Sequence, residues 1–540
     1  MSTQSSAATD PASAAIGTPD NEVPMAGAVA LRQIAVAQFG AASVSLMIAE
    51  RDAAGNLHEL ECLERPVALA RDIFRFGRIS HETMEQAAEA LKAFRRMLLE
   101  YDIPIRDLRC HTTNILSEAR NQEIFLNRMQ VTSGAQVAMI DDGDMTRLLY
   151  LGIRRLLAQN PRLTEGNALV YHIGPGNTRV LYFRRGRIAG YSSYRLGIYR
   201  AREVLAAEDP HDTHANTPEL LEENIRGVIA QLHEDYANYE IDYHVATGNE
   251  IQVVAPHIAT LEDGAYRVPV AELAAVADDL ARRGTDAIVR RFRLNYASGE
   301  GVVPAIQTNQ AVASSFGVPD LWVPEGDFQR AFLSSLFTAA TKSDAFLDEV
   351  LQSARNLGRK YKVDRKHARH VSDLAQTLFR ELRDLHNLAS RFELLLRVAA
   401  LVHEVGMYVS AREHHKHSLY IIANSEVFGL SEADRNLVAL IARYHRRYAP
   451  ERSHPHYSDL SQHHRLVVLK LSALLRIADA LDRTHTQRIH AIAVQRRDRL
   501  VVVECSGVTD TTVEQIAING KGQLFRELFG CDLMFAPAEA

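Results

Sequence analysis

The sequence has few cysteines and lysines, no long apolar run and no excess of positive charge. Its four cysteines form no C-x-x-C pair, which argues against a disulfide framework and a cysteine-type zinc site and favours the cytoplasm. No apolar run approaches the ~18 residues of a membrane helix. Because 61 basic residues face 67 acidic ones, the net charge is −6. We therefore expect neither a membrane nor a nucleic-acid polymer as partner.

Two residue types are unevenly used. The chain has eight lysines against 53 arginines, and 14 of its 23 histidines lie between His367 and His490. Arginine suits forked contacts to phosphate, but a GC-rich coding bias explains the same skew, and we favour that explanation. With 46% hydrophobic and 24% charged residues, the composition is typical of a globular protein. A length of 540 residues predicts three or four domains.

Hydrophobic periodicity divides the chain into units. The Ala-, Ser-, Thr- and Pro-rich start predicts a disordered tail without a secretory signal. Strand patterns at 29–37, 44–50 and 67–71, and a helix from Ser80 to Tyr101, predict an α/β lobe. A strand at 168–174 and a hairpin closed at Arg185-Gly186 begin a second one. The expected units are a tail at 1–28, lobes at 29–155 and 156–325, a helical domain at 326–488, and a small α/β domain at 489–540.

The helical region carries the most specific motifs. Its expected helices span 328–358, 364–386, 390–405, 414–427, 431–448 and 464–483. Successive helices can bring their histidines and carboxylates into one cavity. In order, these residues resemble the HD superfamily of metal-dependent phosphohydrolases, which implies His367 or His370, His403 and Asp479 as metal ligands. The pair reads His403-Glu404 rather than His-Asp, however, so we favour a buried network of hydrogen-bonded histidines over metal binding.

A narrower resemblance covers most of the chain. The words HHKHSLYIIANSEVFGLS, ARYHRR and LLRIADALDRTH are similar to the third domain of long-form exopolyphosphatases in the Ppx/GppA family. This resemblance implies an actin-like (ribonuclease H-like), two-lobed α/β unit followed by an all-α, HD-like domain. It further implies polyphosphate or guanosine penta- or tetraphosphate as ligand, Mg²⁺ as cofactor if hydrolysis is retained, and a homodimer. Some family members also have His-Glu at the pair.

The phosphate-binding loops keep the glycines of the family pattern but lose its charged side chains. The first loop, D-x-G-S-N-S in the family, begins with Gln38, and the second, D-x-G-G-G-S-T-E, begins with His172. The family's phosphate arginine is Ser117, and its catalytic glutamate pair is Asp144-Met145. We expect Asp144 to be the best remaining base, and helix N-termini at Gly40 and Gly176 to offer amides to anions. The expected phosphate-binding residues are Gly40, Ser43, Gly174, Gly176, Asn177, Thr178, Arg179 and Gly248.

Three functions follow from this pattern. The favoured one is a regulatory protein that binds a polyphosphate-type ligand with hydrolysis lost or strongly reduced, because hydrolysis needs a base and a cation to offset charge. The second is an active exopolyphosphatase or guanosine pentaphosphate phosphohydrolase with altered catalytic residues. The third is metal-dependent catalysis in the helical domain.

Overall fold

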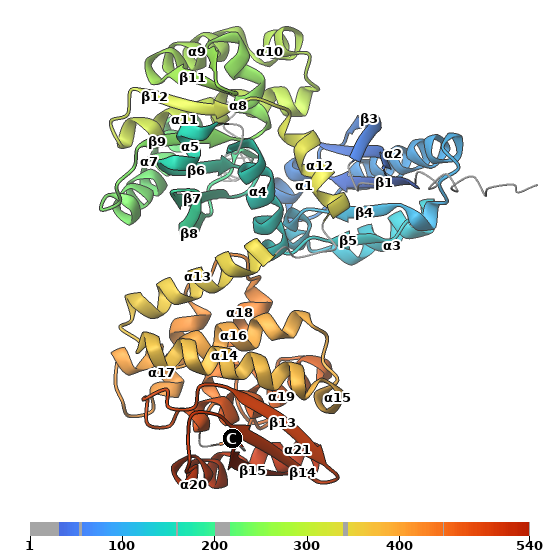
Figure 1. The fold of residues 1–540 in the computed structure, drawn as a ribbon. Helices are drawn as coiled ribbons and strands as arrows, with labels where there is room; N and C mark the ends of the chain where they lie inside the picture. The colour runs from blue at the N-terminus through green and yellow to red at the C-terminus, as the bar shows by residue number, and fades with distance from the viewer. Residues whose placement is uncertain are drawn as a thin grey trace, which may run out of the picture.

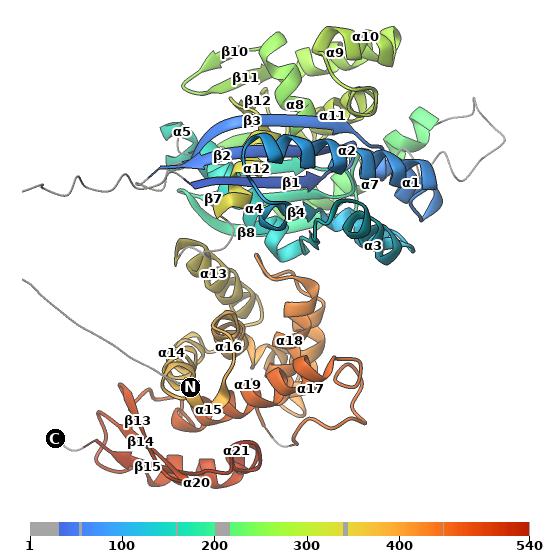
Figure 2. The ribbon, with the colours of Figure 1, turned by 90° about the vertical axis from the view of Figure 1, so that its right-hand side faces the viewer.

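Two α/β lobes lie side by side on a helical domain, and a small C-terminal α/β unit lies at the far end (Figures 1 and 2). The computed structural model describes residues 32–52, 57–157, 160–199, 217–338, 344–446 and 448–538. The expected disordered tail lies outside the described residues. Within the described residues, no helix has the length and apolarity needed to cross a bilayer.

Lobe I is a five-stranded sheet in the order β3-β2-β1-β4-β5. Its strands are β1 (Arg32–Phe39), β2 (Ser43–Arg51), β3 (Leu57–Pro66), β4 (Arg109–Thr112) and β5 (Val137–Met139). Its helices are α1 (Leu69–Phe76), α2 (His81–Glu100), η1 (Ile105–Asp107), η2 (Asn114–Glu118) and α3 (Gln122–Ser133). Helix α2 starts where expected, because the Ser80 hydroxyl accepts a hydrogen bond from the Thr83 amide. The strand expected at 67–71 is wrong, since this segment enters α1.

Lobe II repeats this topology and extends it. Its strands are β6 (Asn167–Ile173), β7 (Thr178–Arg184), β8 (Arg187–Tyr194), β9 (Tyr243–Thr247), β10 (Thr260–Glu262), β11 (Ala265–Pro269) and β12 (Asp320–Pro324). They are ordered β10-β11-β12-β9-β6-β7-β8. The part β8-β7-β6-β9-β12 therefore matches β3-β2-β1-β4-β5. In each lobe the first strand (β1 or β6) pairs antiparallel with the next strand of its hairpin on one side and parallel with a later strand (β4 or β9) on the other. This duplication confirms the actin-like α/β class, and the hairpin at Arg185-Gly186 is also confirmed.

Helices cover lobe II and connect it to lobe I. The helices that follow β5 and continue through lobe II are α4 (Asp142–Leu157), α5 (Pro161–Glu165), α7 (Thr217–Tyr236), α8 (Asn249–Val254), η3 (Ala255–His257), α9 (Val270–Arg283), α10 (Thr285–Phe292) and α11 (Tyr296–Ser315). After β12, helix α12 (Phe328–Thr338) returns to pack against β1 and α4. The sequence pattern predicted one helix of the helical domain at 328–358. The structure describes α12, which packs on lobe I, and a second helix at Asp344–Lys360, and it does not describe residues 339–343.

The helical domain and the C-terminal unit complete the chain. The helices are α13 (Asp344–Lys360), α14 (Arg365–Glu381), α15 (Arg383–His386), α16 (Arg391–Val402), η4 (Val405–Tyr408), α17 (His414–Ala423), α18 (Glu432–Arg443) and α19 (Gln462–Leu481). The C-terminal elements are β13 (Ile492–Arg497), β14 (Leu500–Cys505), α20 (Thr512–Lys521), α21 (Gln523–Phe529) and β15 (Asp532–Pro537). The expected helix at 364–386 is observed as α14 and α15. The other expected helices, apart from the one at 328–358, correspond to observed ones with shifted ends.

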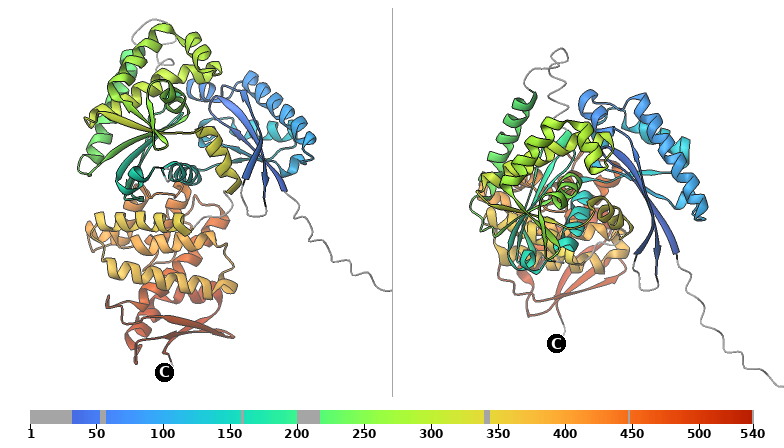
Figure 3. Two further views of the ribbon diagram at one scale, coloured as in Figure 1. Left: turned by 45° about the horizontal axis from the view of Figure 1, so that its top comes forward. Right: turned by 90° about the horizontal axis from the view of Figure 1, so that it is seen from above.

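The helical domain docks on the exposed edge of the lobe II sheet (Figure 3). Strand β8 is an edge strand, so its outer backbone groups need partners. Glu349 accepts from the amide of Ile188 at 3.2 Å, and Asn356 donates to the carbonyl of Ala189 at 3.1 Å. Side chains of the helical domain thus take the place of a further strand.

Candidate functional site

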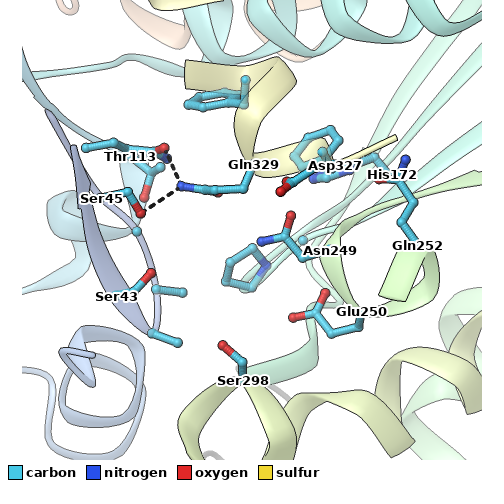
Figure 4. A pocket seen from close by; sticks show the side chains of 18 of the residues that line it. Ser43, Ser45, Thr113, His172, Asn249, Glu250, Gln252, Ser298, Asp327 and Gln329 are labelled. Carbon is cyan, nitrogen blue, oxygen red and sulfur yellow. Dashed lines mark hydrogen bonds between the residues drawn. The ribbon is translucent and has the colours of Figure 1, made fainter. Parts of the chain in front are cut away.

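A cavity of about 720 Å³ lies between the lobes (Figure 4). Its walls come from the β1–β2 and β6–β7 turns, the start of α8, and the start of α12. Six of the expected phosphate-binding residues line it, namely Gly40, Ser43, Gly174, Gly176, Asn177 and Arg179. The other two, Thr178 and Gly248, are not among the lining residues; Thr178 is buried, with its hydroxyl donating to the Leu196 carbonyl.

The two glycine turns have equivalent geometry. The amide of Gly40 donates to the carbonyl of Ser43 at 2.8 Å, and that of Gly174 donates to the carbonyl of Asn177 at 3.0 Å. Each turn therefore closes a β-hairpin, and the expectation that Gly40 and Gly176 begin helices is wrong. Gly197 packs so closely on Gly176 that a Cβ added to Gly197 would lie 2.3 Å from the carbonyl carbon of Gly176, which explains why position 197 needs glycine.

An amide network replaces the charged end of the first loop. The Nε2 of Gln329 donates to Gln38 Oε1 at 3.0 Å and to Ser45 Oγ at 3.3 Å, as Figure 4 shows for Ser45. Gln38 is buried, and Gln329 belongs to α12. One amide group of α12 thus donates to both Gln38 and Ser45 of the first loop.

The second loop begins with a buried neutral imidazole. His172 is buried and stacks on Phe328 with ring centroids 4.6 Å apart. Burial, with the nearby Arg179 guanidinium, lowers the pKa of His172 to about 3. Mg²⁺ selects oxygen ligands, chiefly carboxylates and water, so Gln38 and His172 do not fit the Mg²⁺ site that the resemblance implies.

Arg179 and Asp144 are both engaged elsewhere. The Arg179 guanidinium donates to Asp142 Oδ1 at 2.8 Å, and Asn114 donates to the same oxygen at 2.5 Å. Asp142, at the start of α4, thereby joins lobe I to lobe II. Asp144 accepts from Arg147 Nε at 3.2 Å and is not among the cavity-lining residues.

The sequence interpretation missed the carboxyl groups that line the cavity, namely Glu64, Glu118, Glu250, Glu325 and Asp327. Glu250 lies in the first turn of α8 and faces the cavity near Ser298, with Ser43 on the opposite wall (Figure 4). Burial raises the pKa of Glu250 to about 7. Its position directly after the Gly248 turn was the available signal, because α/β sheets bind ligands beyond the carboxyl ends of their parallel strands.

The expected metal residues of the helical domain are only partly brought together. His367, His403 and Asp479 form one buried group with ligand atoms within 4.8 Å of one another. His370 lies one turn further along α14 and does not join this group.

Comparisons with known proteins agree with this architecture. Sequence models described as the Ppx/GppA phosphatase family and as Ppx/GppA phosphatase, domain III, match residues 47–302 and 351–507. A guanosine-5'-triphosphate,3'-diphosphate pyrophosphatase of Aeromonas hydrophila is 24% identical, with 73% of this chain and 77% of that protein covered. A protein with the same description from Pseudoalteromonas atlantica is 21% identical, with 88% and 89% covered.

Solved structures match part of the chain. An exopolyphosphatase from Cytophaga hutchinsonii matches with a TM-score of 0.48 at 16% identity, covering 58% of this chain and 99% of that one. The Aquifex aeolicus member of the Ppx/GppA family has a TM-score of 0.43 at 18% identity, covering 58% and 100%. The two sequence models, which lie on the lobes and on the helical domain, establish that the chain belongs to the Ppx/GppA phosphatase family.

Proposed function

We propose that this family member binds polyphosphate or a guanosine polyphosphate in the cavity between its lobes, with phosphoanhydride hydrolysis lost or strongly reduced. The observation that carries the proposal is the replacement of charge by neutral, mutually bonded groups. Gln38 is tied to Gln329, and His172 is buried as a neutral ring. Removing one acid–base group typically costs 10²–10⁴-fold in rate, and here the cation-holding groups of both loops are replaced.

The scaffold that would hold a phosphate chain is nevertheless intact. Both hairpin turns keep their glycines at the cavity wall, and Ser43, Asn177 and Ser298 offer polar side chains there. Homodimer formation stays a prediction from the family resemblance.

Ligand-induced thermal shift tests the binding part. We expect polyphosphate, guanosine pentaphosphate or guanosine tetraphosphate to raise the melting temperature, because binding stabilises by about 2.7 kcal/mol at a ligand concentration of 100 Kd. Ser43→Glu places a carboxylate in the cavity wall and should remove the shift. The same change at the exposed Ser458, outside the cavity, should leave it. Absence of any shift, or a shift that survives Ser43→Glu, contradicts binding in this cavity.

Glu250 supports a second candidate, an active phosphohydrolase with a relocated base. A carboxyl with a pKa of about 7 is well suited to take a proton from water at neutral pH. Phosphate release from polyphosphate that is abolished by Glu250→Gln, with the thermal shift retained, would establish this candidate over the first. Asp144→Asn is the matched control, and we expect it to have no effect on release.

A further inference from the structure

An ion pair at the junction of the lobes engages two hydrogen-bond donors of the cavity wall. Asn114, in η2 of lobe I, and Arg179, in β7 of lobe II, both line the cavity. Both side chains donate to Asp142 Oδ1, Asn114 at 2.5 Å and Arg179 at 2.8 Å. Asp142, the first residue of α4, is not among the lining residues. One carboxylate oxygen therefore holds a donor from each lobe.

The two partners of the ion pair differ in their exposure to solvent. The Arg179 side chain is 6% exposed, whereas the Asp142 side chain is 54% exposed. A guanidinium withdrawn from water needs an anionic partner, while a carboxylate at the surface gains little from such a pair. Arg179 is thus the fixed member of the pair, and Asp142 is the member that another anion can replace.

Asp142 uses only part of the Arg179 guanidinium. The carboxylate contacts Nη2, and among the described residues Nε has no hydrogen-bond partner although it is buried. Arg267 forms the complete fork elsewhere in lobe II, where Nε and Nη2 both donate to Asp320, at 2.9 and 2.6 Å. Because a phosphate group presents several oxygens, it accepts from both nitrogens of such a fork. Phosphate would therefore satisfy a donor that Asp142 leaves unpaired.

Arg179 also belongs to the second phosphate loop. It is the last residue of the run 172–179, at the position where the family pattern D-x-G-G-G-S-T-E has glutamate. The run contains the hairpin turn in which the Gly174 amide donates to the Asn177 carbonyl, and both of these residues line the cavity. A guanidinium, the group best suited to forked contacts with phosphate, thus follows directly on this turn.

We propose that Asn114 and Arg179 form a phosphate subsite that spans the two lobes, and that Asp142 occupies this subsite as an internal competitor. The inference rests on the proposed function, since the group that displaces Asp142 is a phosphate of the ligand bound in the cavity. On binding, the phosphate accepts from both donors and the Asp142 carboxylate turns to solvent. Affinity is lower than the subsite alone would give, because part of the binding free energy is spent on displacing Asp142.

Calorimetric titration of the full-length protein with inorganic tripolyphosphate and with guanosine tetraphosphate tests the competitor. Asp142→Asn keeps the shape of the side chain and removes its charge, so we expect it to bind about 5–10-fold more tightly than wild type. Arg179→Gln should bind at least about 10-fold more weakly, because the forked cation is lost. Asp320→Asn removes the carboxylate of the Arg267 pair, which lies outside the cavity, and should bind as wild type.

A double-mutant cycle shows whether Asp142 acts through Arg179. In the Arg179→Gln background, Asp142→Asn should change affinity by no more than about 2-fold, because the donor for which it competes is gone. Melting without ligand adds a second readout. Asp142→Asn leaves a buried guanidinium without its countercharge, so we expect a lower melting temperature than wild type and a larger ligand-induced shift. A residue that only supports the fold would lower both.

Each of the other outcomes is decisive. If wild type binds and Asp142→Asn binds no more tightly, the competitor is refuted and the proposed function stands. An equal gain from Asp142→Asn with and without Arg179 also overturns it, because the carboxylate would then repel the ligand directly. If neither wild type nor Asp142→Asn binds either probe, the proposed function and this inference both fail. Binding by Asp142→Asn alone would refute the proposed function for the wild-type chain and support the competitor.

Discussion

At the scale of single residues, the two glycine loops of the cavity begin with Gln38 and His172, where the family pattern has aspartates. Gln38 accepts a hydrogen bond from Gln329, and His172 stays unprotonated because burial and Arg179 disfavour its charged form. Glu250 is the titratable cavity group whose pKa of about 7 lies in the physiological range. Other charged side chains also line the cavity, namely Glu64, Glu118, Glu325, Asp327, Arg179, Arg293 and Arg330, and Glu250 adds a charge that changes near neutral pH.

Ligand affinity is consequently expected to depend on pH through this one side chain. Glu250 is ionised above its pKa of about 7 and neutral below it, so it repels phosphate at pH 8 and not at pH 6. A unit charge a few ångströms away is worth about 1 kcal/mol or more, so polyphosphate should bind about 5–10-fold more tightly at pH 6. Glu250→Gln should bind tightly at both pH values, as measured by calorimetry. An equal pH dependence in wild type and variant would show that another group titrates.

Returning carboxylates to the two loops should create a magnesium site. In the Gln38→Asp, His172→Asp double variant, we expect Mg²⁺ to stabilise the fold by about 1.4 kcal/mol at ten times its Kd, whereas wild type gains nothing. Without Mg²⁺ the variant should be less stable than wild type, because both carboxylates are buried. His244→Asp is the matched control, since this buried histidine lies on β9 and does not line the cavity. Mg²⁺ rescue of His244→Asp would contradict a local site.

At the scale of elements, short sequence patterns predicted which segments form helices and hairpins. They predicted less well the residues at which these elements begin and end. The Ser80 cap and the Arg185-Gly186 turn act through neighbouring backbone groups, so short sequence windows contain them. The segment 67–71 has strand-like residues, but it turns into α1 after Val67 and Ala70 donate to the first hairpin turn, at the carbonyls of Ala42 and Ala41. The position of Glu250 at the cavity likewise depends on which strands are neighbours in the sheet. A short sequence window does not contain that information.

Helix α4 offers an element-scale test of the contact between lobe and helical domain. A Cβ on Gly143 would lie 2.5 Å from the Ser431 amide and 2.9 Å from the Leu430 carbonyl carbon, both backbone atoms. We expect Gly143→Ala to destabilise the protein by about 1–3 kcal/mol through overpacking. Gly152→Ala, on the same helix with no atom within 4 Å, should instead stabilise by about 0.5–1 kcal/mol. Denaturant unfolding measures the free energy of unfolding of both variants. Equal effects would show that the loop carrying Ser431 moves to accommodate the added Cβ.

At the scale of the whole molecule, the repeated strand order was foreseeable because each lobe restarts with a strand, a glycine turn and a hairpin. The return of α12 to lobe I was not, since packing on β1 and α4 is a long-range property. The docking of the helical domain also depends on distant residues. Phe428 contacts the rings of Tyr150, Phe346 and Tyr191 at centroid distances of 5.4, 5.6 and 5.7 Å.

This aromatic group should make the lobes and the helical domain unfold together. Phe428 is fully buried, and truncating a buried Phe costs about 3–5 kcal/mol. Because the lost contacts join α4 and β8 to Phe428 of the helical domain, we expect Phe428→Ala to split a single calorimetric transition into two. Phe525→Ala removes an equally buried ring inside the C-terminal unit and should lower stability without splitting the transition. If both variants melt in one transition, coupling between the domains resides in the backbone contacts of β8 with Glu349 and Asn356 rather than in the rings.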